Sequence, residues 1–197
     1  MKLFLVRHGR TIENEQNICQ GQMPGTLSEI GKKQIKSIAK RLKEEEFDKI
    51  YSSDLKRCVD TTKEIIKYHP NTEVIYDTRL RERSRGIFEG KTHEEIKNHM
   101  KENNLEYKNF KPKGGETFDE VTKRVSEFID EIIEKDHGKN ILVVTHGGPK
   151  VHTMLHLLEG YESSNIDKIK NTSLSIFELN KEKKYELTLF NCTKHLE

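Results

Sequence analysis

Short apolar runs alternate along this chain with longer segments whose apolar residues recur every three or four positions. The clearest runs are 3–6 and 141–144, where every residue is apolar, as in strands buried on both faces of a parallel sheet. Further strands are expected at 50–51, 74–76, 174–179 and 185–190. This alternation of strand and helix patterns predicts a layered α/β fold.

Each longer segment carries one apolar face, as expected for helices that cover a sheet. Ser28 is the expected N-cap of the first helix, and 52–54 are interpreted as the cap of the second. Gly114 and Gly115 precede the strongest amphipathic pattern, a short helix is expected at 92–100, and 101–113 is interpreted as a surface loop. The expected buried faces are Leu27, Ile35, Ile38, Ala39 and Leu42; Val59, Thr62, Ile65 and Ile66; and Phe118, Val121, Val125, Phe128, Ile129 and Ile132.

Length and composition fit one globular domain. The chain has 197 residues, of which we assign 1–195 to the domain and interpret 196–197 as a vector-derived remnant. Lys and Arg number 35 against 33 Asp and Glu, and this near balance argues against nucleic acid as the main partner. The first apolar run is too short for a signal peptide or a membrane span. Together with three cysteines that we interpret as reduced thiols, this predicts a cytoplasmic protein without a membrane partner.

Two apolar strands each end in a histidine followed by a glycine, at His8 and at His146. In open α/β sheets, ligands bind beyond the carboxyl ends of the strands, and a glycine such as Gly147 lets the backbone approach a ligand. Arg7 beside His8 supplies the charged, paired donors that oxyanions require. Arg57 lies early in an expected helix, and composition alone favours a solvated position for it.

These strand ends belong to an ordered set of motifs that resembles the histidine phosphatase superfamily, which includes the phosphoglycerate mutases. The resemblance implies a three-layer α/β/α sandwich with a mostly parallel central sheet, the fold that the strand and helix pattern also favours. A single Arg-His-Gly would be weak evidence, but blocks in this order over nearly the whole chain are highly specific. The blocks are Leu5–Asn14, Gln20–Gly21, Leu27–Gln34, Ser52–Arg57, Leu80–Glu82, Glu89–Gly90, Gly114–Thr117 and Val144–Gly147.

The resemblance implies a role for each site residue. His8 would attack phosphorus and become a phosphohistidine, while Glu82 would act as general acid and then as base. The phosphoryl oxygens would be held by Arg7, Arg57 and His146, assisted by Asn14, Gln20 and Gly21. Phosphoryl transfer depends mainly on positioning and charge stabilisation, so these cations would replace a metal ion, and no cofactor is implied. The expected partner is a small phosphorylated metabolite.

A closer resemblance covers 76–83 and 88–91 and is to fructose-2,6-bisphosphatases of the TIGAR type, which implies fructose 2,6-bisphosphate as a substrate. This chain departs from that group at Arg85, where those enzymes and the mutases carry a tyrosine, and at 23–26, which lack the common aspartate. Arg83, Arg85 and Lys91 flank Glu82, and we hypothesise that they bind a second phosphate or a carboxylate.

Several alternatives stay open. A phosphoglycerate mutase is less favoured, because the insert 91–113 contains no arginine to hold a carboxylate. Broad-specificity, α-ribazole and phosphoserine phosphatases remain alternatives, while a catalytically inactive phosphate sensor is disfavoured because His8 and Glu82 are both present. His152 and His156 have a spacing that can bind zinc, but their apolar neighbours favour a packed helix. The sequence does not indicate an oligomeric state.

Overall fold

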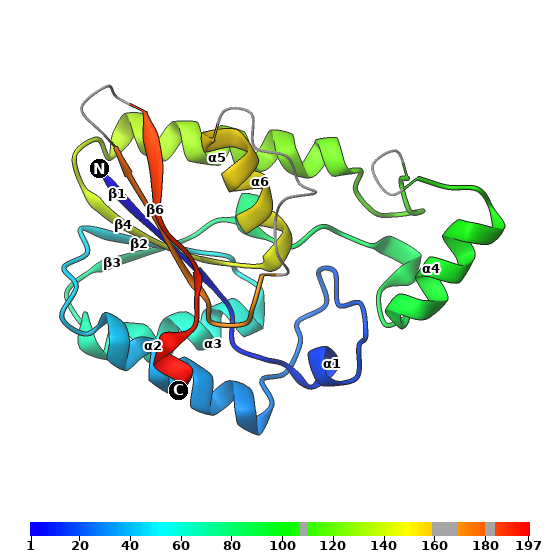
Figure 1. Cartoon of the computed structure of the whole chain (residues 1–197), viewed down its shortest axis with the longest axis horizontal. Helices are drawn as coiled ribbons and strands as arrows, with labels where there is room; N and C mark the ends of the chain where they lie inside the picture. Colours follow the sequence, from blue (N-terminus) through cyan, green and yellow to red (C-terminus); the bar gives the residue numbers. More distant parts are fainter. Residues whose placement is uncertain (107–109, 159–168, 180–183) are drawn as a thin grey trace.

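A six-stranded sheet runs through the middle of the part of the chain that the computed structural model describes, residues 1–106, 110–158, 169–179 and 184–197 (Figure 1). The strands are β1 (Lys2–Arg7), β2 (Lys49–Ser52), β3 (Glu73–Tyr76), β4 (Asn140–Thr145), β5 (Leu174–Leu179) and β6 (Tyr185–Cys192). Their order is β3-β2-β4-β1-β5-β6, with β3, β2, β4 and β1 parallel and the last two antiparallel. The predicted strands and the mostly parallel sheet are therefore confirmed.

Helices cover both faces of this sheet, which confirms the three-layer arrangement (Figure 1). On one face lie α2 (Glu29–Leu42) and α3 (Lys56–Ile65), and on the other α5 (Phe118–Lys135) and α6 (Gly147–Leu157). The short α1 (Ile12–Glu15) and α4 (His93–Glu102) lie away from the layers. Short 3-10 helices are η1 (Ile66–Tyr68), η2 (Thr78–Leu80), η3 (Gly86–Phe88) and η5 (Lys194–Leu196). None of the described helices is both long and apolar enough to span a bilayer.

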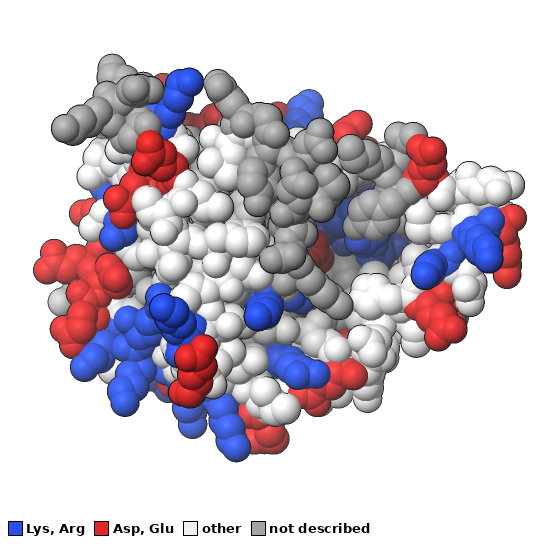
Figure 2. All heavy atoms as spheres, viewed as in Figure 1, with Lys and Arg blue, Asp and Glu red and all other residues white. Residues whose placement is uncertain are grey.

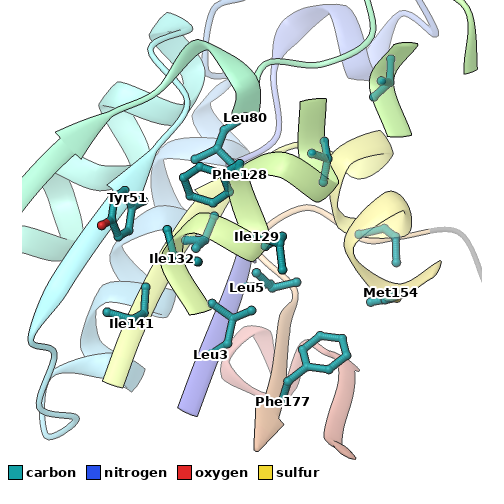
Figure 3. Close-up of a cluster of buried hydrophobic side chains, with 14 residues drawn as sticks. Leu3, Leu5, Tyr51, Leu80, Phe128, Ile129, Ile132, Ile141, Met154 and Phe177 are labelled. Carbon is teal, nitrogen blue, oxygen red and sulfur yellow. The ribbon is translucent and has the colours of Figure 1, made fainter. Parts of the chain in front are cut away.

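The two apolar runs at the centre of the sheet supply both hydrophobic cores. Successive side chains of a strand point to opposite faces, so β1 places Leu3 and Leu5 against α5 and α6 but Phe4 and Val6 against α2 and α3. β4 divides its side chains in the same way. Figure 3 shows the first of these cores, in which Phe128 of α5 lies among residues of the sheet. Burial on both faces explains why neither strand alternates apolar and polar residues.

Side-chain caps set the starts of three helices. The Ser28 hydroxyl accepts a hydrogen bond from the amide of Gly31, which confirms the predicted cap. Thr92 and Thr117 each form a capping box, with Glu95 and Glu120 respectively. The helix expected at 92–100 therefore begins where predicted and ends two residues later.

The interpretation of 52–54 as a helix cap was wrong. The N-cap of α3 is Leu55, which makes no side-chain cap hydrogen bond, although the Ser53 hydroxyl accepts from its amide at 3.3 Å. The buried face of α3 also differs from the prediction, because Val59 and Ile66 are only half-buried. The fully buried positions are Arg57, Cys58, Thr61, Thr62 and Ile65. α3 begins beside the carboxyl end of β4. Its first turns therefore contact polar groups rather than apolar side chains.

The interpretation of 101–113 as a surface loop needs a similar correction. The last residues of α4 occupy its start, and Phe110 packs against the small cluster formed by Cys19, Phe88 and Ile96. Residues 107–109 lie outside the described part of the chain. The domain limits, including the interpretation of 196–197, stay a prediction; Leu196 lies in the closing 3-10 helix.

Removing the Phe128 ring tests the role of the α5 core. The ring is fully buried and packs edge-on against Tyr51, with centroids 5.4 Å apart. We expect Phe128→Ala to lower the free energy of unfolding by about 3–5 kcal/mol, because it leaves a cavity that the core cannot fill. Urea unfolding followed by circular dichroism measures the change. As a control, Ile30→Ala removes a 50% exposed side chain and should cost less than about 0.5 kcal/mol. Equal losses in the two variants would contradict this account.

Candidate active site

The two strand-end histidines lie side by side because β1 and β4 are neighbours in register. Val6 pairs with Val144 and Arg7 with Thr145, and the His8 amide donates to the Thr145 carbonyl at 3.0 Å. The ring centroids of His8 and His146 are 5.1 Å apart, and the two residues are 2% and 0% exposed. The parallel sheet therefore brings both imidazoles to one edge, as predicted.

One hydrogen bond sets the tautomer of His8. Its Nδ1 lies 2.7 Å from the carbonyl oxygen of Gly9, and since a carbonyl can only accept, Nδ1 carries the proton. The neutral ring consequently has its lone pair on Nε2. Burial lowers the pKa of His8 well below its usual value, and the positive charges of Arg57 and Arg7 lower it further. His8 is therefore a neutral imidazole with a nucleophilic nitrogen.

Arg57 is the deepest charged group of the site, at 1% exposure. Its Nε donates to His146 Nδ1 at 3.1 Å, and another guanidinium nitrogen donates to the Gly21 carbonyl at 2.8 Å. His146 Nδ1 is thus an acceptor, so Nε2 carries the proton and donates to the Ser53 hydroxyl at 2.9 Å. Arg57 is buried in the site. The resemblance implied that it holds phosphoryl oxygens, whereas composition alone favoured a solvated position.

Arg7 reaches the same pocket from the end of β1. One of its terminal nitrogens donates to the carbonyl of Ile169, whereas Nε is buried and has no hydrogen-bond partner among the described residues. A buried donor without a partner is costly, and an anion bound in the pocket would satisfy it. Burial lowers the pKa of Arg7, and the opposing carboxylate of Glu82 raises it. The pocket thus holds positive charge that the surrounding protein leaves partly unsatisfied.

Glu82 closes the opposite side of the pocket. Its carboxylate accepts from the amides of Arg83 at 2.9 Å and of Gly148 at 3.1 Å. The backbone carbonyl of Glu82 accepts hydrogen bonds from the side chains of Gln22 and Arg124, each at 3.2 Å. A side chain at Gly148 would meet the Glu82 carboxylate, because an added Cβ lies 2.3 Å from Oε1. The carboxyl group is therefore fixed at the start of α6, where it lines the same pocket as His8.

The remaining predicted site residues differ in position. Asn14, Gln20, Gly21 and Arg85 line the pocket, and the side-chain amide oxygen of Gln20 is buried without a partner among the described residues. Gly147 opens α6 but is not among the residues that line the pocket; a Cβ added to it would lie 3.7 Å from the Arg7 guanidinium. Lys91 does not line the pocket: its side chain is 56% exposed and lies 3.7 Å from the Glu95 carboxylate.

Sequence reasoning missed several members of the site. Ser53 follows β2, whose carboxyl end lies at the same sheet edge as those of β1 and β4, and it belongs to the motif block Ser52–Arg57; these two signals could have identified it. His152 is packed in α6, as interpreted, with Nδ1 2.9 Å from the Thr122 hydroxyl, but it also lines the pocket. Burial lowers its pKa to about 4. Other lining residues that the sequence did not indicate are Ile18, Cys19, His93, Phe118 and Gly148.

The geometry has a clear chemical meaning. A neutral imidazole, one buried and one half-buried guanidinium group and a carboxyl group line one pocket, which can hold a tetrahedral oxyanion between donors while a proton moves at its mouth. Within the described residues, no three His, Cys, Asp or Glu side chains are grouped so that they could hold a metal ion.

Comparison with known proteins gives consistent matches. The family described as the histidine phosphatase superfamily (branch 1) matches residues 3–193. A metal-independent phosphoserine phosphatase of Arabidopsis thaliana is 35% identical over 99% of this chain and 83% of its own length. The Bos taurus fructose-2,6-bisphosphatase TIGAR is 38% identical over 70% of this chain and 54% of its own length. The structure of Bacillus stearothermophilus YhfR superposes with a TM-score of 0.88 at 27% identity, covering 100% of this chain and 99% of that one.

Titration of the His8 ring tests its electrostatic environment. We expect His8 to be neutral at about pH 6, where an ordinary histidine is mostly protonated, because its folded pKa lies well below 6.5. Unfolding then takes up a proton below pH 6.5, so the His8 contribution to stability decreases as pH falls through that region. Ring nitrogen chemical shifts measure the protonation state, and His8→Ala identifies the signal. A His8 midpoint at or above 6.5 would contradict the described burial.

Proposed function

The chain belongs to the histidine phosphatase superfamily, and we propose that it hydrolyses small phosphomonoesters through a phosphohistidine on His8, without a metal ion. The class of enzyme, a phosphoric monoester hydrolase, agrees with relatives that are named as phosphatases. The observation that carries the proposal is the shared pocket of His8, Arg7, Arg57 and Glu82, with a proton-free Nε2 and an unsatisfied guanidinium donor.

In the first step, His8 Nε2 attacks phosphorus and the bond to the alcohol oxygen breaks. Glu82 acts as the general acid and gives a proton to the departing oxygen, which leaves as a neutral alcohol. The guanidinium groups of Arg7 and Arg57 stabilise the charge on the phosphoryl oxygens. The resemblance implied that His146 holds phosphoryl oxygens, but His146 is not among the residues that line the pocket, and its two ring nitrogens are hydrogen-bonded to Arg57 and Ser53. We therefore assign His146 the role of positioning Arg57.

In the second step, water attacks the phosphohistidine from the side that the alcohol has left. Glu82, now a carboxylate, accepts the water proton, the P–N bond breaks, and inorganic phosphate is released from neutral His8. The amides of Arg83 and Gly148 hold this carboxylate in place through both steps. One residue thereby serves as acid and then as base at a single position.

The alcohol end of the substrate is less constrained than the phosphate end. Fructose 2,6-bisphosphate is a candidate because Arg83 and Arg85 line the pocket beside Glu82 and match a second anionic group. Phosphoserine is an alternative that is supported by a relative aligned along almost the whole chain. A mutase is less favoured, since 91–113 offers only lysines as cations, and Lys111 is paired with Glu120.

Substitution of the proposed nucleophile and acid tests the mechanism. We expect His8→Ala to lower kcat/KM by about 10⁴-fold or more and Glu82→Gln by about 10²–10⁴-fold, because each removes a group that acts in the reaction. Phosphate release from an aryl phosphate, phosphoserine, fructose bisphosphates and phosphoglycerates measures the effect. A radiolabelled phosphate should be trapped on the wild-type protein by an alkaline quench, but not on His8→Ala.

The matched control is His156→Ala, which removes an exposed α6 imidazole that pairs with Asp130 outside the pocket. It should retain wild-type activity, and a chelator should leave the wild-type rate unchanged. Phosphate release by His8→Ala at the wild-type rate would overturn the mechanism. Transfer of the phosphoryl group between phosphoglycerates, faster than its release as phosphate, would support the mutase instead.

Arg85 provides a separate test of the second anionic group. We expect Arg85→Ala to raise KM by about tenfold or more for a hexose bisphosphate, because a charge-assisted hydrogen bond is lost, and to affect the matching monophosphate less. Steady-state kinetics on both esters measure the difference. Arg85→Lys keeps the charge and should recover part of the loss. An equal rise in KM for the two esters would contradict a role for Arg85 in binding a second anion.

A further inference from the structure

A second cavity, of about 480 Å³, adjoins the catalytic pocket along α4. The two share three wall residues, Cys19, Arg85 and His93, so the cavity continues from the side of the pocket where Arg85 lies. In Figure 2 this face of the molecule is hollowed beside α4, with Lys and Arg atoms recessed in the hollow. We name this cavity the α4 groove; its other lining residues are Ile96, Lys97, Met100, Lys101 and Leu105.

The α4 groove has a mainly apolar wall. Ile96 and Met100 lie one helical turn apart on one face of α4, and Leu105 follows just after the helix, with its amide bonded to the Met100 carbonyl at 2.9 Å. Lys97 and Lys101 are exposed and lie at the rim. A row of partly accessible apolar side chains next to a phosphate-sized pocket is a suitable surface for an apolar ligand portion.

The α4 groove is a formed part of the structure rather than a loose flap. Thr92 and Glu95 cap the start of α4, and Ile96 anchors the helix on Cys19 and Phe88. The Phe88 and Phe110 rings meet edge-on at 5.7 Å behind it. The wall therefore exists before a ligand arrives, which reduces the cost of ordering it on binding.

We propose that the α4 groove holds the alcohol part of the substrate, and that the preferred substrates are phosphomonoesters whose alcohol carries an apolar body, such as a straight alkyl or aryl group. This inference rests on the proposed function. Arg7 and Arg57 hold the phosphoryl group, so the alcohol leaves toward Glu82 and Arg85, where the groove begins. A compact sugar would leave the half-buried Met100 and Leu105 in contact with water, whereas an apolar chain would bury them.

A series of straight-chain alkyl phosphates, from ethyl to hexyl, tests the inference on the wild-type protein. These alcohols leave with nearly equal ease, so differences in kcat/KM report contacts made by the chain rather than chemistry. We expect kcat/KM to rise by about two- to fourfold for each added methylene until the groove is filled. Initial rates of phosphate release, measured below the concentration at which the esters form micelles, give the series.

Substitutions in α4 and just after it test whether the dependence of kcat/KM on chain length arises in the α4 groove. Leu105→Glu places a charge in the α4 groove and should lower the ratio of kcat/KM for hexyl over ethyl phosphate by about tenfold. Asn98→Glu places the same charge at an exposed position of α4 outside the groove and should leave this ratio unchanged. Met100→Gln is a second groove variant, and circular dichroism checks that each protein is folded.

The outcomes separate this inference from the function on which it rests. A flat or falling series, with all esters hydrolysed and the activity lost in His8→Ala, overturns the groove proposal and leaves the phosphatase intact. An equal change of the ratio in Leu105→Glu and Asn98→Glu also overturns it. If no ester is hydrolysed by the folded wild-type protein, the proposed function fails, and the assignment of the groove fails with it.

Discussion

The site depends on the guanidinium group of Arg57, which is almost completely shielded from solvent. Arg57 is 1% exposed, and each hydrogen bond it makes to a described residue ends on a neutral acceptor, such as the Gly21 carbonyl or His146 Nδ1. A buried charge is costly unless it is paired, so a site of this kind favours an anion strongly. Burial lowers the pKa of His8 and of His146 well below the usual value, and the positive charge of Arg57 lowers both further, which favours neutral imidazoles.

The parallel sheet supplies the rigidity that this arrangement needs. The central strands β1 and β4 are buried on both faces, and their ends deliver Arg7, His8 and His146 with little freedom. Lys150 adds to this order, because its buried ammonium donates to the Leu5 carbonyl and to the Ser173 carbonyl and hydroxyl. Lys150 of α6 thus ties β1 to the residue that immediately precedes β5.

The two ends of the proposed substrate meet different parts of the molecule. The phosphate end would lie at the carboxyl ends of β1 and β4, whereas the alcohol end would meet α4, which stands apart from the sheet on a small cluster of its own (Figure 1). Changes in α4 therefore alter few contacts of the main cores. This separation permits specificity to vary while the phosphate pocket stays the same, in agreement with the range of phosphatases that resemble this chain.

The sequence by itself determined the strands, the helix cap at Ser28, the presence of a helix at 92–100 and the family, because these depend on local spacing and on ordered motifs. It also indicated His8 and His146, whose strand ends are visible as apolar runs. Only the tertiary structure decided the burial of Arg57, the contacts of Ser53 and Gly148, the exposure of Lys91 and the α4 groove. A polar residue looks the same in the sequence whether its side chain is solvated or buried. Its environment is formed by residues that are distant in sequence and that only the packing of the fold brings together.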